Sequence, residues 1–119
     1  MGKKILFVDD NADWRAMMET SLKDAGYEVS TAKDASEALV QMGEGKPAVV
    51  VLDLDLAGES GAMLMKFVKQ NDPDLPIILY TGLDQDAEVI MTLLAEGAHS
   101  YVRKGSPQEL IQALEEALK

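Results

Sequence analysis

Two pairs of carboxylates follow short apolar runs in this sequence. Asp9 and Asp10 come directly after the run ILFV. Asp53 and Asp55, separated by one leucine, come after the run VVVL. Such runs are typical of strands buried on both faces of a sheet. A carboxylate at the end of a buried strand needs a cation to compensate its charge, and oxygen ligands without His or Cys favour a hard cation such as Mg²⁺.

A hydroxyl group and an ammonium group follow two further strand-like segments. Thr81 comes after IILY, and Lys104 comes after SYVR. A carboxylate can act as a nucleophile toward a phosphoryl group, and phosphoryl transfer depends mainly on positioning and neutralisation of charge. These residue types therefore predict an aspartyl-phosphate site in which Asp53 attacks and Asp9 and Asp10 hold Mg²⁺. In this prediction Lys104 and Thr81 contact the phosphoryl oxygens.

These side chains meet only if strands alternate with helices along the chain. Apolar runs predict strands at residues 5–8, 49–52 and 77–80, an alternating pattern predicts one at 27–32, and a fifth short strand is expected at 99–103. Helical spacing of apolar residues predicts five helices, at residues 12–25, 35–43, 62–70, 85–96 and 107–119. Residues 58–61 are expected to form a loop. The alternation predicts a single doubly wound (βα)5 domain of the α/β class over residues 1–119, with a parallel sheet whose carboxyl edge carries the site.

Local signals support two of the predicted helices. Asp34, with Glu37 three residues later, is typical of a capping box at the start of the second helix. Ser106, Pro107 and Glu109 match the N-cap, N1 and N3 preferences at the start of the last helix. Methionines at helical spacing are expected in the core rather than on a binding surface: Met17, Met18, Met63, Met65 and Met91.

The composition excludes several classes of function. The 119 residues carry a formal net charge of −10, which disfavours direct binding to nucleic acid or to an anionic membrane surface. The chain has no cysteine, so disulfides, thiolate chemistry and Cys-type zinc sites are excluded. No apolar run approaches the roughly 20 residues of a membrane-spanning helix. A cytoplasmic location is expected.

Four segments together resemble the receiver domain of response regulators, the phosphoacceptor module of two-component signalling and phosphorelays. ILFVDDN, VVVLDLDLAGESG, IILYTG and EGAHSYVRK occur in the order and at the spacing of that family. Each segment alone is a weak signal, whereas four in register are a strong one. The resemblance covers essentially the whole chain and implies a flavodoxin-like fold with strand order 2-1-3-4-5.

The resemblance also implies the roles of the acidic residues. Asp53 matches the residue that accepts a phosphoryl group from a phosphohistidine of a histidine kinase or phosphotransfer protein. Asp10 matches a direct ligand of Mg²⁺, and Asp9 matches a residue that holds the ion mainly through water. Asp55 matches the position whose backbone carbonyl ligates the metal, and its side chain matches a position where the family tunes hydrolysis.

The remaining site residues correspond to the switch of the family. Lys104 matches the lysine that pairs with the acceptor and then with the phosphoryl group. Thr81 matches the hydroxyl that binds the phosphoryl group, and Tyr101 matches the aromatic switch residue. The resemblance implies a signalling domain, monomeric or weakly dimeric, that catalyses only its own phosphorylation and dephosphorylation. Its partner would be an effector domain or downstream protein on the face of the fourth helix, fifth strand and fifth helix.

Two positions depart from the family pattern. Ala57 stands four residues after the acceptor, where the family usually has proline. Gly105 directly follows Lys104, where the family usually has a proline joined through a cis bond. Because a cis bond before a non-proline residue costs ~2.5–4 kcal/mol, we expect a trans bond or an unusual backbone geometry at the glycine.

Two other functions are compatible with parts of the sequence. VVVLDLDL resembles the first motif of haloacid-dehalogenase-type phosphatases, in which the second carboxylate, here Asp55, would act as general acid and base. Ala57 argues against this, because that motif has Thr or Val there. A pseudo-receiver that works without phosphorylation is the other alternative. The complete acidic set argues against it, and the altered loop after Lys104 leaves it open.

Overall fold

A five-stranded parallel sheet forms the centre of the protein. The computed structural model describes residues 2–56, 59–82, 86–105 and 107–119. The strands are β1 (Lys4–Val8), β2 (Glu28–Ala32), β3 (Val49–Leu52), β6 (Ile77–Thr81) and β7 (Ser100–Arg103), and they pair in the order β2-β1-β3-β6-β7. Counting only these five strands along the chain, the order is 2-1-3-4-5, so the predicted topology is confirmed.

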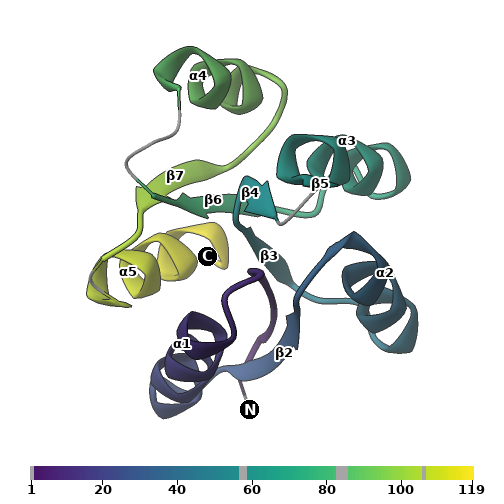
Figure 1. Cartoon of the computed structure of the whole chain (residues 1–119). Helices are drawn as coiled ribbons and strands as arrows, with labels where there is room; N and C mark the ends of the chain where they lie inside the picture. Colours follow the sequence, from purple (N-terminus) through teal and green to yellow (C-terminus); the bar gives the residue numbers. More distant parts are fainter. Residues whose placement is uncertain (1, 57–58, 83–85, 106) are drawn as a thin grey trace.

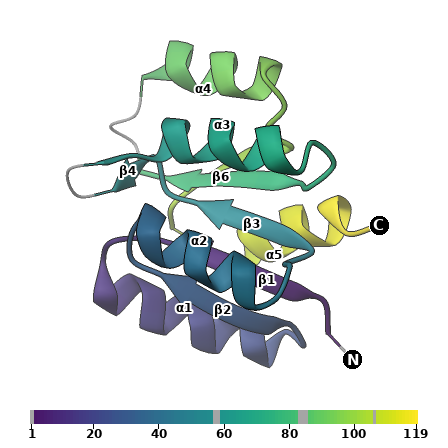
Figure 2. The ribbon, with the colours of Figure 1, turned by 90° about the vertical axis from the view of Figure 1, so that its right-hand side faces the viewer.

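Five helices cover both faces of the sheet (Figures 1 and 2). They are α1 (Ala12–Asp24), α2 (Ala35–Glu44), α3 (Gly61–Asn71), α4 (Ala87–Ala95) and α5 (Pro107–Ala117). The side chains of α1 and α5 pack on one face, and those of α2, α3 and α4 pack on the other. Within the described part of the chain, none of these helices has the length and apolar character needed to cross a bilayer.

The central strands are apolar throughout because each one contributes to two cores. In β1, Ile5 and Phe7 point toward α1 and α5, whereas Leu6 and Val8 point toward the helices of the opposite face. Successive side chains of a strand alternate between the faces of a sheet, so a strand covered on both sides needs an unbroken apolar sequence. The same rule places Tyr80 of β6 on the face covered by α1 and α5.

Side-chain caps fix where the helices begin. Asn11 accepts a hydrogen bond from the Trp14 N–H at 2.9 Å, and Asp34 accepts one from the Glu37 N–H at 2.9 Å. Such caps satisfy backbone donors that have no partner within the helix. The predicted cap at Asp34 is therefore confirmed, whereas the predicted cap at Ser106 lies outside the described residues.

A short antiparallel hairpin follows β3 where we expected only a loop. Its strands are β4 (Asp55–Leu56) and β5 (Glu59–Ser60), and α3 begins directly after them. Two-residue strands have no periodicity that a sequence could reveal. A side chain at Gly61 would meet the carbonyl oxygen of Asp53, so the close return of the chain to the end of β3 requires glycine.

The methionines divide between core and surface, in contrast to our prediction. Met18 and Met65 are buried, but Met17, Met63 and Met91 are 43%, 66% and 69% exposed. Helix residues one or two positions apart point in different directions, so neighbouring methionines cannot all share the buried face. The expectation was therefore wrong for the three exposed residues.

We expect Met65→Ala to lower the free energy of unfolding by about 2–5 kcal/mol, because it leaves a cavity between α3 and the sheet. Met63→Ala is the matched control on the same helix, and its exposed side chain predicts a change within about 0.5 kcal/mol. Urea denaturation measures both values. Equal losses for the two variants would contradict the assignment of Met65 to the core.

Candidate functional site

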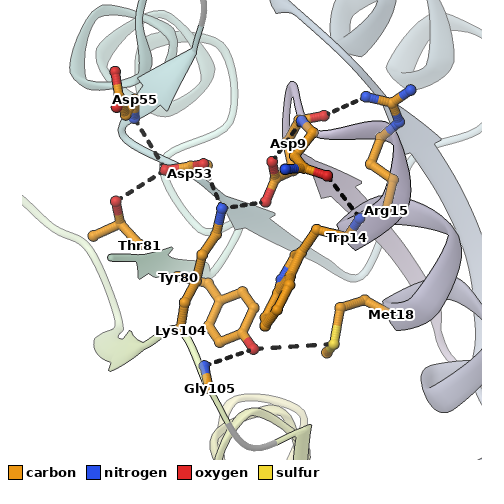
Figure 3. A network of polar contacts seen from close by, with 11 residues as sticks. Asp9, Trp14, Arg15, Met18, Asp53, Asp55, Tyr80, Thr81, Lys104 and Gly105 are labelled. Atoms are coloured by element: carbon orange, nitrogen blue, oxygen red, sulfur yellow. Dashed lines mark hydrogen bonds and ion pairs between the residues drawn. The ribbon is translucent and has the colours of Figure 1, made fainter. Parts of the chain in front are cut away.

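Four strand ends bring the predicted reactive groups together at the carboxyl edge of the sheet (Figure 3). The Lys104 Nζ atom lies 2.8 Å from Asp53 Oδ2 and 2.6 Å from Asp9 Oδ2. The Thr81 hydroxyl donates a hydrogen bond to Asp53 Oδ1 at 2.9 Å. The sequence prediction that these four side chains share one site is thus matched by their positions.

Asp53 lies at the centre of this site and is almost completely buried. Its side chain accepts hydrogen bonds from the hydroxyl of Thr81, the ammonium group of Lys104 and, at 3.0 Å, the backbone N–H of Asp55. These donors hold both carboxylate oxygens in fixed positions. Ion pairing and hydrogen bonding are the compensation that a buried carboxylate requires.

Asp9 is fully buried beside Asp53. Its Oδ1 atom accepts the Asn11 N–H at 2.9 Å, and its Oδ2 atom pairs with Lys104. Burial raises the pKa of Asp9 above its usual value, and the hydrogen bonds from Lys104 and Asn11 offset only part of this effect. Folding therefore disfavours the charged form of Asp9 relative to its protonated form.

Lys104 carries the positive charge between these two carboxylates. Burial alone would lower the pKa of Lys104, but its hydrogen bonds to Asp53 and Asp9 outweigh burial, so the pKa is raised. The ammonium group also lies 5.7 Å from the centre of the Trp14 ring, within range of a cation–π contact. Lys104 is thus held in its protonated form.

Three carboxylates at this edge could hold a metal ion. Asp9, Asp10 and Asp53 each offer an oxygen atom, and these atoms lie within 4.8 Å of one another. The Asp10 side chain is exposed, whereas the other two are buried. An all-oxygen donor set that is open to solvent on one side fits Mg²⁺, which usually keeps several of its waters.

Asp55 and Tyr101 stand apart from this cluster. The Asp55 side chain is exposed and points away from Lys104, and only its backbone N–H contacts Asp53 (Figure 3). Tyr101 of β7 is partly buried and packs against the core under α2, α3 and α4. In the described part of the chain, neither side chain makes a polar contact with Lys104 or Thr81.

Three further residues support the site, and sequence reasoning missed two of them, Arg15 and Tyr80. The Arg15 guanidinium donates to the carbonyl oxygen of Asp9 at 2.7 Å. Trp14 lies beside Lys104, and the Tyr80 hydroxyl lies under the following residue, Gly105. Trp14 and Arg15 follow the acidic pair within one helical turn, which is a usable signal. No sequence signal marks Tyr80, because the pattern around it indicates only a strand residue of the core.

The loop after Lys104 has a trans peptide bond, since the described residues contain no cis bond. Gly105 has a φ of 159°, and its N–H points to the Tyr80 hydroxyl. Both outcomes that we expected from the absent proline thus occur together. The second departure, Ala57, lies outside the described residues.

A doubly wound sheet of this strand order, with acidic residues, a threonine and a lysine at its carboxyl edge, defines a receiver-type flavodoxin-like domain. The family model of the response regulator receiver domain matches residues 5–115. The chain belongs to this family.

Individual relatives agree with this assignment. The chemotaxis protein CheY of Thermotoga maritima is 32% identical over 120 residues, which cover 100% of both chains. The virulence transcriptional regulatory protein PhoP of Shigella flexneri is 35% identical over 115 residues, covering 97% of this chain and 51% of PhoP. The crystal structure of the receiver domain of NtrX from Brucella abortus has a TM-score of 0.89 at 33% identity, covering 96% of this chain and 97% of that domain. The chain thus spans about half the length of PhoP.

We expect Asp9→Asn to raise the melting temperature by a few degrees at pH 7.5 in EDTA. A carboxyl group whose pKa is raised by folding contributes stability below its unfolded pKa, and this contribution is lost as pH rises through the folded pKa. Removing the charge therefore removes a cost that is present at neutral pH. Calorimetry measures the change.

Asp10→Asn is the matched control, because it removes the same charge from an exposed side chain of the cluster. Its melting temperature should rise less than that of Asp9→Asn. A fall in the melting temperature of Asp9→Asn would show instead that the ion pair with Lys104 outweighs the burial of Asp9.

Proposed function

We propose that residues 1–119 form one receiver domain in which Asp53 accepts a phosphoryl group from a phosphohistidine of a histidine kinase or phosphotransfer protein. One carboxylate oxygen forms a bond to phosphorus as the bond from phosphorus to the histidine nitrogen breaks. The observation that carries this proposal is the placement of Asp53. It is a buried carboxylate with Lys104 and Thr81 donating to its oxygens.

The neighbouring residues serve this reaction by holding charge in place. Lys104 already lies at the oxygens where negative charge increases, so little rearrangement is needed when the phosphoryl group arrives. Thr81 is a second donor on the other oxygen. Asp9, Asp10 and Asp53, together with the backbone carbonyl of Asp55, would hold Mg²⁺. When bound, Mg²⁺ neutralises charge on the transferred group.

The consequence of phosphorylation is a change in a protein-binding face. An aspartyl phosphate carries more negative charge than the carboxylate it replaces. Thr81, which already donates to Asp53, turns its hydrogen bond to the phosphoryl group. Tyr101 follows, and the face of α4, β7 and α5 changes its fit to an effector domain or downstream protein. The domain is a monomer or weak homodimer in the cytoplasm and catalyses only its own phosphorylation and dephosphorylation.

We expect Asp53→Asn to abolish labelling by radioactive acetyl phosphate, because the amide is not a nucleophile toward phosphorus. Labelling of the unmodified protein should require Mg²⁺ and stop in EDTA. Protein electrophoresis under acidic conditions and mass spectrometry measure the label. Asp55→Asn is the matched control, because Asp55 lies two positions after Asp53 and its side chain is exposed. This variant loses the same charge and should remain labelled.

Three results would contradict the proposal. Label that persists in Asp53→Asn would place the acceptor elsewhere, and an unmodified protein that never becomes labelled would indicate a pseudo-receiver. Steady release of phosphate from small phosphomonoesters, with no accumulation of label, would indicate the phosphatase alternative.

We expect Mg²⁺ to change the fluorescence of Trp14, the only tryptophan. Its ring lies near Lys104, whose surroundings change when a cation joins the carboxylates. Asp10→Asn should weaken the apparent affinity roughly tenfold, because it removes a charged ligand. Asp13→Asn removes a charge next to Trp14 but outside the cluster, and it should leave the affinity unchanged. Equal affinities for all three proteins would contradict the assigned metal site.

A further inference from the structure

We propose that Tyr80 is a positioning residue for Lys104 and that it acts through the backbone N–H of Gly105. The inference rests on the proposed function, because the ammonium group of Lys104 matters through its contact with the acceptor. It concerns the part of the site where this chain departs from its family.

Two consecutive backbone N–H groups tie the Lys104 loop to strand β6. The N–H of Lys104 donates to the carbonyl oxygen of Thr81 at 2.8 Å. The N–H of Gly105 donates to the hydroxyl of Tyr80 at 3.5 Å. Because Tyr80 and Thr81 are adjacent in β6, one strand holds both peptide units that flank the Lys104 Cα atom.

The second of these contacts exists only because residue 105 is not proline. Proline has no N–H group, so the residue that the family usually has at this position could not donate to Tyr80. A proline ring also fixes φ near −65°, whereas Gly105 has a φ of 159°. The hydrogen bond to Tyr80 therefore constrains a loop that lacks the constraint of a proline.

The hydroxyl of Tyr80 is itself held in a fixed position. The Tyr80 ring is buried between Phe7, whose ring centre lies 6.0 Å away at 61°, and Trp14, whose ring centre lies 6.2 Å away. Its hydroxyl donates to the Met18 sulfur at 4.0 Å, which leaves the oxygen lone pairs available to Gly105. Because the Tyr80 ring is packed on both sides, its hydroxyl cannot move with the loop after Lys104. The hydrogen bond therefore restrains the loop.

Trp14 connects this support to the reacting groups. Its ring contacts Tyr80 on one side and lies 5.7 Å from the Lys104 ammonium group (Figure 3). Trp14 and Tyr80 together form an aromatic support beside the Lys104 ammonium group.

The proposal is tested with Tyr80→Phe, which removes the hydroxyl and keeps the ring. The rate of phosphorylation by acetyl phosphate should fall about threefold, the effect of one weak neutral hydrogen bond. The affinity for beryllofluoride, a phosphoryl mimic that contacts Lys104, should fall by the same factor. The Mg²⁺ affinity should not change, because carboxylates hold the ion. Amide hydrogen exchange at Gly105, followed by NMR, should become faster.

Tyr27→Phe is the matched control. Tyr27 packs against the same apolar cluster but precedes β2, at the opposite edge of the sheet. It should leave the phosphorylation rate, both affinities and the Gly105 exchange rate unchanged. Thermal melting of both variants shows whether any loss follows from lower stability.

Each other outcome overturns the proposal. A Tyr80→Phe protein that matches Tyr27→Phe in rate and affinity shows that the hydroxyl has no role. Parallel losses of Mg²⁺ and beryllofluoride binding show a general disturbance of the site. A slower rate with unchanged exchange at Gly105 rules out the route through that N–H. If the unmodified protein is not labelled at Asp53, the proposed function fails, whereas the exchange measurement still decides whether Tyr80 holds the loop.

Discussion

One ammonium group between two buried carboxylates is the interaction on which this structure depends. Asp9 and Asp53 lie side by side in a region from which water is largely excluded, and Lys104 forms an ion pair with both of them. Without a shared cation, two neighbouring buried carboxylates raise each other's pKa and one takes up a proton. The balance of charge at this edge of the sheet therefore depends on where the fold places one lysine from the far end of the chain.

The register of the sheet provides that placement. Val8 pairs with Leu52, Leu52 pairs with Leu79, and Thr81 pairs with Arg103, so neighbouring strands end at nearly the same level. The residue after each of β1, β3 and β7 is a site residue, and β6 ends in Thr81. Right-handed crossovers return the chain to the same edge each time. Apolar alternation sets the register, since a slip of one residue would turn every strand side chain to the wrong core.

The strands and the site residues at their carboxyl ends could be predicted from the sequence because their signals are local. Each central strand must be apolar on both faces, and a polar residue that follows such a run marks the edge where ligands bind. The β4–β5 hairpin has no such signal, and the exposure of Met63 depends on which helix face meets the sheet. The contact between Tyr80 and Gly105 joins residues 25 positions apart through a backbone N–H. No pattern of side chains could reveal it.

The charge of the site explains why its support has to be rigid. Asp9, Asp10 and Asp53 with Lys104 leave two net negative charges, which a divalent cation can balance. Under the proposed function, phosphorylation adds negative charge at the position that Lys104 already faces. A lysine side chain has many rotamers and loses considerable entropy when it is fixed. Anchoring its backbone through two N–H groups lowers the entropy that would remain to be lost on binding of a phosphoryl group under the proposed function.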